Sequence, residues 1–163
     1  MQKFSQKYTI IALLEDKEEG FEYASNSWPL HVTIADTFAV EREASSLDDK
    51  LSDLVSKRKP VTGVADHDEF FGASQEVQVT ILDMSEQLVA LHYDVIGLLK
   101  SSGAVLNDPQ YSEEGFRAHA TVQPHARLTI GDEVTLTKLA IIDMFPNEDP
   151  YQRKILKVIN LEG

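Results

Sequence analysis

Short stretches in which apolar and polar residues alternate recur along most of this 163-residue chain and restrict its fold more than any other feature. Alternation with a period of two is typical of β-strands that bury one face. Prolines separate the last of these stretches, most clearly within 146–150. The sequence therefore predicts seven or eight short strands, at about 8–14, 30–35, 61–64, 77–82, 116–123, 134–144 and 153–161.

Only two segments have the spacing of an amphipathic helix. The first lies between Arg42 and Lys59 and is closed by Pro60. The second follows Ser85, a good N-cap, and Gly103 lies just past its end, where a left-handed residue is favoured. Few helices among hairpin-like runs of strands favour an α+β fold with antiparallel sheets over a doubly wound parallel sheet.

The size and composition of the chain predict one compact domain spanning residues 1–163. A hydrophobic content of 42% supports a real core, and the sequence contains no linker or low-complexity tract. Each half carries one helix and one histidine-x-threonine strand. We therefore expect two pseudo-symmetric lobes, divided near residues 60–75, in a monomeric protein.

The charge balance restricts the partners. Fifteen basic and 27 acidic residues give a net charge of −12, which should repel duplex DNA but still allow a small nucleotide or one RNA end to bind in a cleft. The sequence has no cysteine, no membrane-length apolar run and no secretory signal at its start. We therefore expect a cytoplasmic protein that does not associate with membranes.

Two copies of one short motif carry the candidate chemistry: His31-Val32-Thr33 and His119-Ala120-Thr121. Residues i and i+2 of a strand share a face, so each histidine should lie beside its threonine. The apolar neighbours of both motifs would then face the core. Two imidazoles and two hydroxyls are thus expected to line one cleft.

Phosphodiester chemistry explains this set of side chains. One neutral histidine can deprotonate the attacking water, one charged histidine can protonate the leaving oxygen, and threonine hydroxyls can donate to the phosphoryl oxygens. No metal ion or other cofactor is then required. The catalytic candidates are His31, Thr33, His119 and Thr121.

The motifs, read as Leu30-His31-Val32-Thr33-Ile34 and Ala118-His119-Ala120-Thr121-Val122, resemble the signature of the two-histidine (2H) phosphoesterase superfamily. That superfamily includes 2′-5′ RNA ligase-like proteins and cyclic phosphodiesterases. The resemblance implies a bilobal fold with two antiparallel sheets around a central cleft and one main helix packed on each. It also implies a metal-independent opening of 2′,3′-cyclic phosphates on nucleotides or RNA ends.

The sequence also departs from that family. Ala118 stands where many relatives have proline, and Gln123-Pro124 where many have a basic residue. Arg117 is therefore a candidate phosphate contact, and Tyr151 resembles a tyrosine that relatives place near the cleft. The resemblance implies that His119 activates water while His31 protonates the leaving oxygen. The cation of Arg117 would support this division by lowering the pKa of His119.

Two other functions fit the same residues. The first is a non-catalytic module of the same fold that binds a phosphate or nucleotide. The second is a metal hydrolase that uses His119, His125 and a nearby carboxylate, although this spacing matches no familiar ligand pattern. His67 is interpreted as a surface residue, His92 as a helix-packing residue, and His125 as turned away from the cleft.

Overall fold

The computed structural model describes residues 6–41, 47–72, 74–83 and 85–161. Six strands form an antiparallel sheet, which we call the large sheet. Its neighbours, in spatial order, are β2 (Glu22–Ala24), β10 (Gln152–Asn160), β9 (Lys138–Asp143), β1 (Tyr8–Leu13), β3 (His31–Ala39) and β6 (Val105–Leu106). Both ends of the chain therefore contribute to one sheet.

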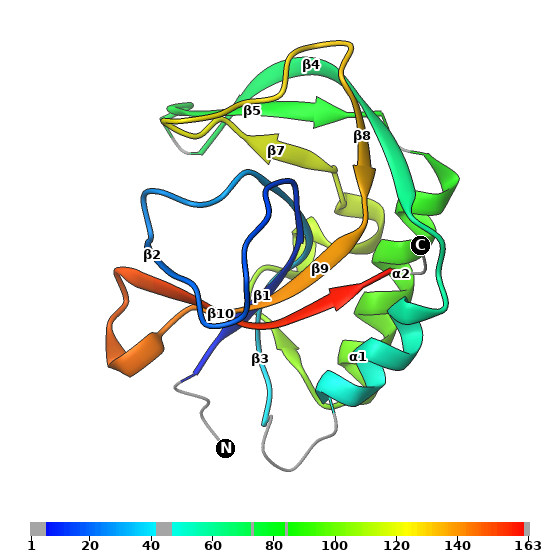
Figure 1. Cartoon of the computed structure of the whole chain (residues 1–163), viewed down its shortest axis with the longest axis vertical. Helices are drawn as coiled ribbons and strands as arrows, with labels where there is room; N and C mark the ends of the chain where they lie inside the picture. Colours follow the sequence, from blue (N-terminus) through cyan, green and yellow to red (C-terminus); the bar gives the residue numbers. More distant parts are fainter. Residues whose placement is uncertain (1–5, 42–46, 73, 84, 162–163) are drawn as a thin grey trace.

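Four further strands form the small sheet, which lies beyond one side of the large sheet (Figure 1). Its order is β7 (His119–Thr121), β5 (Val77–Leu82), β4 (Val61–Phe71) and β8 (Glu133–Leu136), with antiparallel pairing throughout. The expected α+β fold with two antiparallel sheets is confirmed. The chain changes sheet several times, so a division near residues 60–75 marks only the first crossing.

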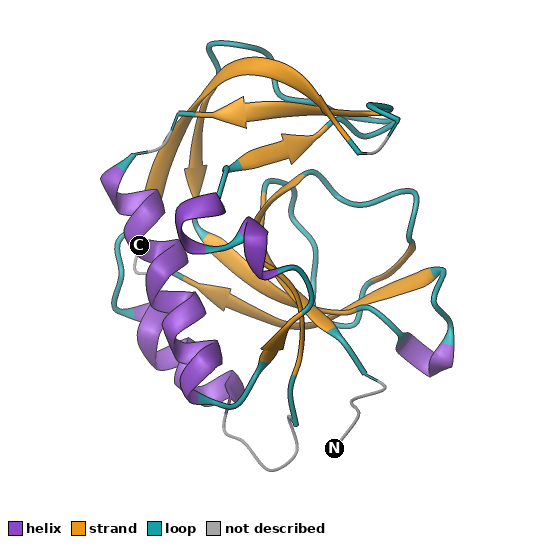
Figure 2. Ribbon diagram, turned by 180° about the vertical axis from the view of Figure 1, so that it is seen from behind, coloured by secondary structure: helices purple, strands orange, loops and turns teal. Residues whose placement is uncertain are grey.

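Helices α1 (Leu47–Ser56) and α2 (Glu86–Ser101) lie side by side along one flank of the molecule (Figure 2). Helix α1 contacts β10, whereas α2 contacts β3 and β4. Helix α1 thus packs on the large sheet, and α2 packs on both sheets. The signals that bound α2 are confirmed: the Ser85 side chain accepts a hydrogen bond from Leu88 N, and Gly103 has a φ of +85°. The first residues of the expected 42–59 helix, 42–46, lie outside the described residues.

Apolar side chains cover both faces of the large sheet. The main core packs the helices against one face, and it includes Val32 and Ile34 from β3 together with Ala118 and Ala120. A smaller cluster on the other face contains Ile11, Leu13, Tyr23, Ala140, Ile142 and Ile155, with Trp28 packed against it. The predicted burial is confirmed for Leu30, Val32, Ile34, Ala118 and Ala120. It is wrong for Val122, which is half-buried and lines a cavity.

Strand β4 is much longer than the 61–64 segment predicted. Its first part pairs with β8 along one edge and its second part with β5 along the other, and a bulge between Ala65 and His67 interrupts the pairing with β5. The bulge shifts the alternation and hides a strand within the polar run 66–69. Three short 3₁₀ helices complete the described chain, at Pro109–Tyr111 (η1), Glu113–Gly115 (η2) and Pro146–Glu148 (η3). No helix in the described ranges is long and apolar enough to span a bilayer.

Candidate active site

The two motifs meet where the sheets adjoin, because β3 and β7 contact each other. His31 and His119 each begin their strand and are held in the same way. The Nδ1 atom of His31 lies 2.7 Å from Pro29 O, and that of His119 lies 2.8 Å from Arg117 O. A carbonyl oxygen only accepts, so each Nδ1 carries the proton. Each neutral imidazole therefore keeps an unprotonated Nε2 for chemistry.

Two cavities flank this junction. A cavity of about 490 Å³, which we call the first cavity, is lined by Thr33 and His119. The second cavity, of about 460 Å³, is lined by His31 and Thr121. Each cavity thus combines the histidine of one motif with the threonine of the other. The structure brings all four predicted residues together, in crossed pairs.

His31 is the more enclosed of the two histidines, with 7% of its surface exposed. The Trp28 indole lies against its ring, with centroids 4.8 Å apart. Burial lowers the pKa of His31 to about 4, against the opposing effect of the Pro29 carbonyl, and the His119 charge lowers it further. His31 is therefore neutral at physiological pH.

His119 lies in a more open position. The Phe71 ring meets it edge-on at 4.9 Å. Burial lowers the pKa of His119, the Arg117 carbonyl and the Asp36 carboxylate oppose this, and the Arg117 cation lowers it slightly. The expected effect of Arg117 is present but small. Burial, which the pattern of the strand does not show, lowers the pKa of His31 and so favours the opposite division of roles.

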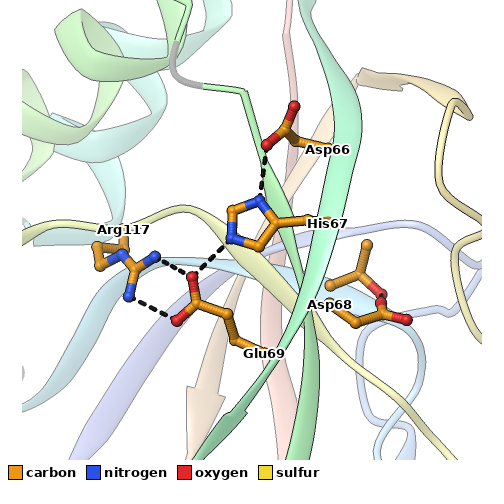
Figure 3. Close-up of polar contacts among 6 residues, drawn as sticks. Asp66, His67, Asp68, Glu69 and Arg117 are labelled. Atoms are coloured by element: carbon orange, nitrogen blue, oxygen red, sulfur yellow. Dashed lines mark hydrogen bonds and ion pairs between the residues drawn. The ribbon is translucent and has the colours of Figure 1, made fainter.

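Arg117 lines the first cavity, where it is already paired (Figure 3). Its guanidinium donates to both carboxylate oxygens of Glu69, with a distance of 2.9 Å to Oε1. The guanidinium carbon also lies 5.7 Å from the centre of the Phe71 ring. Glu69 accepts a second contact from His67, and these two partners lower the pKa of its carboxyl to about 2. Sequence reasoning did not find Glu69, which is 48 positions from Arg117.

Several other cavity residues were missed as well. Asp36, Tyr111 and Phe116 line the first cavity, and Trp28 lines the second. Asp36 lies beyond irregular pairing between β1 and β3, so the i, i+2 rule did not reach it. Tyr111 ends the short helix η1, which the sequence did not predict. Phe116 lies in the segment between η2 and β7, within the strand predicted at 116–123, where it was not singled out.

His92 also lines the first cavity, yet it is a packing residue as expected. Its Nδ1 lies 2.7 Å from Ile34 O, and its Nε2 accepts from Glu113 N at 2.8 Å. Its ring stacks on Phe116 at 3.8 Å. Both ring nitrogens are thus used in linking α2 to β3 and η2.

Tyr151 and His125 lie outside both cavities. Tyr151 is 74% exposed, and its carbonyl oxygen accepts from Ser25 N, so its role at the cleft stays a prediction. His125 contacts Glu15 at 2.7 Å, and Glu15 also accepts from Leu30 N. His125 is therefore turned away from the cavities, as expected. In the part of the chain that the structure describes, no three His, Asp or Glu side chains are grouped to hold a metal ion.

Comparisons with known proteins agree with this geometry. Residues 3–150 match the model of the 2′-5′ RNA ligase superfamily. Escherichia coli LigT complexed with 3′-AMP superposes with a TM-score of 0.61 at 16% identity, covering 97% of this chain and 99% of that one. LigT complexed with NADP+ gives 0.57 at 16% identity, covering 99% and 100%. A structure described as a phosphoesterase gives 0.58 at 17% identity, covering 97% and 99%.

A search of curated protein sequences finds no match. The structural likenesses, at this identity, establish the fold. The family model spans most of the sequence, including both histidine motifs. On this evidence the chain belongs to the 2′-5′ RNA ligase superfamily and has the fold of the two-histidine phosphoesterases.

Proposed function

We propose that this protein is a metal-independent phosphoesterase that opens 2′,3′-cyclic phosphates on nucleotides or RNA ends. The observation that carries the proposal is the crossed arrangement of the two motifs: His31 with Thr121 in one cavity, and His119 with Thr33 in the other. A phosphoryl group between the cavities would meet two imidazole Nε2 atoms and two hydroxyl groups. These are the groups that acid–base cleavage of a phosphodiester needs.

The proposed reaction assigns the base to His31. Its Nε2 removes a proton from a water molecule, whose oxygen attacks phosphorus. The bond from phosphorus to one ribose oxygen breaks, and His119, protonated on both nitrogens, gives its Nε2 proton to that oxygen. The product is a 2′- or 3′-phosphomonoester. This reverses the division implied by the family resemblance. Burial lowers the pKa of His31 to about 4, whereas at His119 the Arg117 carbonyl and the Asp36 carboxylate oppose the lowering by burial.

The proposed binding contacts follow from the same cavities. Thr33 and Thr121 would donate to the non-bridging phosphoryl oxygens, and Arg117 would contact the phosphate from the first cavity. Tyr151 stays a candidate for contacting the bound substrate. No metal or other cofactor is needed for this reaction.

The proposed substrate is a small nucleotide or an RNA terminus. Complexes of E. coli LigT with 3′-AMP and NADP+ support this size of ligand. The net charge of −12 argues against duplex DNA. We further propose that the protein acts as a monomer in the cytoplasm.

The test is hydrolysis of the four 2′,3′-cyclic mononucleotides, with and without EDTA. We expect turnover that EDTA does not reduce, and a loss of about 10² to 10⁴-fold in kcat for His31→Ala and for His119→Ala. His125→Ala, which lies outside both cavities, is the control and should keep wild-type activity. EDTA-sensitive turnover would indicate a metal hydrolase. Binding of 3′-AMP without turnover would indicate a non-catalytic module.

A further inference from the structure

The two cavities contain little free positive charge. Arg117 is the only lysine or arginine among the described residues that line the two cavities. Its guanidinium is engaged by both oxygens of Glu69. A phosphate that binds this end of the guanidinium in a bidentate manner needs the same N–H groups. At this end, substrate phosphate therefore competes with Glu69 for Arg117.

Glu69 is itself shared with a second cation (Figure 3). His67 lies between two carboxylates, with Nδ1 2.6 Å from Asp66 Oδ2 and Nε2 2.6 Å from Glu69 Oε2. Carboxylate oxygens only accept, so both ring nitrogens must donate, and His67 is an imidazolium in this arrangement. Hydrogen bonds to Glu69 and Asp66 accordingly raise the pKa of His67. The charges alternate along Asp66, His67, Glu69 and Arg117.

Strand geometry places the side chains of His67 and Glu69 on the same face of β4 as Phe71, which lines the first cavity. His67, Glu69 and Phe71 are spaced two apart on β4, after the bulge, so they share a face. Phe71 lines the first cavity and lies near the guanidinium of Arg117. Asp68 points the other way (Figure 3) and bonds to Thr80 and Arg127. Two neighbouring carboxylates thus occupy opposite faces of one strand.

We propose that Glu69 is a positioning residue. It pairs with Arg117 at the first cavity, and this ion pair opens when Arg117 binds the phosphate of the substrate. The Glu69 and Arg117 side chains are 31% and 50% exposed, and ion pairs this open to solvent are weak enough to exchange. The Phe71 ring keeps the guanidinium near the cavity when the ion pair with Glu69 opens. His67 shares Oε2 of Glu69 and so weakens the hold of Glu69 on Arg117.

This arrangement predicts opposite effects on phosphate binding for substitutions of Glu69 and of His67. Removing the charge of Glu69 frees Arg117 and should tighten phosphate binding. Removing His67 leaves Glu69 with Arg117 as its remaining cationic partner and should weaken phosphate binding. If these charged side chains had only a structural role, both substitutions would weaken phosphate binding.

The inference rests on the proposed function for the identity of the substrate, so its test measures binding and not turnover. The probe is inorganic phosphate, titrated by calorimetry at constant pH and ionic strength. We expect Glu69→Gln to lower Kd about tenfold, the range of one charge-assisted contact. His67→Gln should raise Kd, and Arg117→Ala should raise it more. In the Arg117→Ala background, Glu69→Gln should have no more effect than a charge-matched control.

That control is Asp68→Asn, which removes the same charge one residue away but on the opposite face of β4. Unchanged or weaker binding by Glu69→Gln would overturn the proposal. Tightening that Asp68→Asn reproduces, or that persists without Arg117, would also overturn it. Expected shifts in Kd without any hydrolysis of cyclic phosphates would leave the inference standing and overturn the proposed function. Hydrolysis without the shifts would do the reverse.

Discussion

The indole of Trp28 lies against the imidazole of His31, with ring centroids 4.8 Å apart and 31° between their planes. The indole keeps water from one side of the histidine, and burial is the main reason that the pKa of His31 is low. Trp28→Ala should therefore raise the pKa of His31 toward 6.5, as followed by NMR titration of its ring proton. Trp28→Phe keeps an apolar ring and should shift it less. An unchanged pKa in Trp28→Ala would show that other residues exclude the water.

Acid should destabilise the folded protein. The pKa of His31 is about 4 in the folded state and 6.5 for a free histidine, so the unfolded chain binds the proton first as pH falls. The contribution of neutral His31 to the free energy of unfolding is complete above pH 6.5. It falls by about 3 kcal/mol as the pH drops from 6.5 to about 4. The lowered pKa values of His92 and His119 act in the same direction. Urea unfolding at several pH values should show the loss, and a smaller slope in His31→Asn.

The division of roles between the histidines can be tested with a leaving group that needs no proton. A substrate whose leaving ribose oxygen is replaced by sulfur removes the requirement for a general acid. If His119 is the acid, this substrate should restore most of the rate lost in His119→Ala and leave His31→Ala slow. Single-turnover rates measure this directly. Selective rescue of His31→Ala would return the roles to those implied by the family resemblance.

The two threonines should contribute less than the histidines. Thr33→Val and Thr121→Val each remove a hydroxyl donor from a different cavity, and such donors stabilise a transition state by about 2 to 4 kcal/mol at most. We expect kcat to fall by about 10 to 10³-fold with unchanged circular dichroism. Thr135→Val, on β8 and outside both cavities, is the control. Wild-type kinetics in both cavity variants would mean that the threonines only fit their strands.

The motif strands were predictable because apolar and polar residues alternate through each motif. Val32 and Ile34 are buried on the core face of β3, so the placement of His31 and Thr33 followed from the sequence. The same rule failed in β4, where a bulge after Ala65 shifts the alternation and a polar run becomes a strand. Local pattern does not reveal this bulge, because a bulge is a feature of the pairing with another strand, here β5.

The chemistry of the site was less predictable than its location. Burial lowers the pKa of His31, and Trp28, which packs against its ring, lies before the strand and outside its alternation. The partner of Arg117 is Glu69 on another strand, and no short-range spacing connects them. Such contacts arise from the way the sheets fold over each other. They are set by tertiary structure and have no counterpart in local periodicity.

The large sheet has a consequence for how the molecule assembles. Its central strand, β1, pairs on one side with β3 and on the other with β9, which lies near the opposite end of the chain. During synthesis β1 and β3 can form a hairpin early, but β9 and β10 reach the sheet only after the small sheet has been made. Such distant pairings slow folding and leave a strand edge open meanwhile. The edge of β1 that later receives β9 is thus the surface that a nascent chain must keep from aggregating.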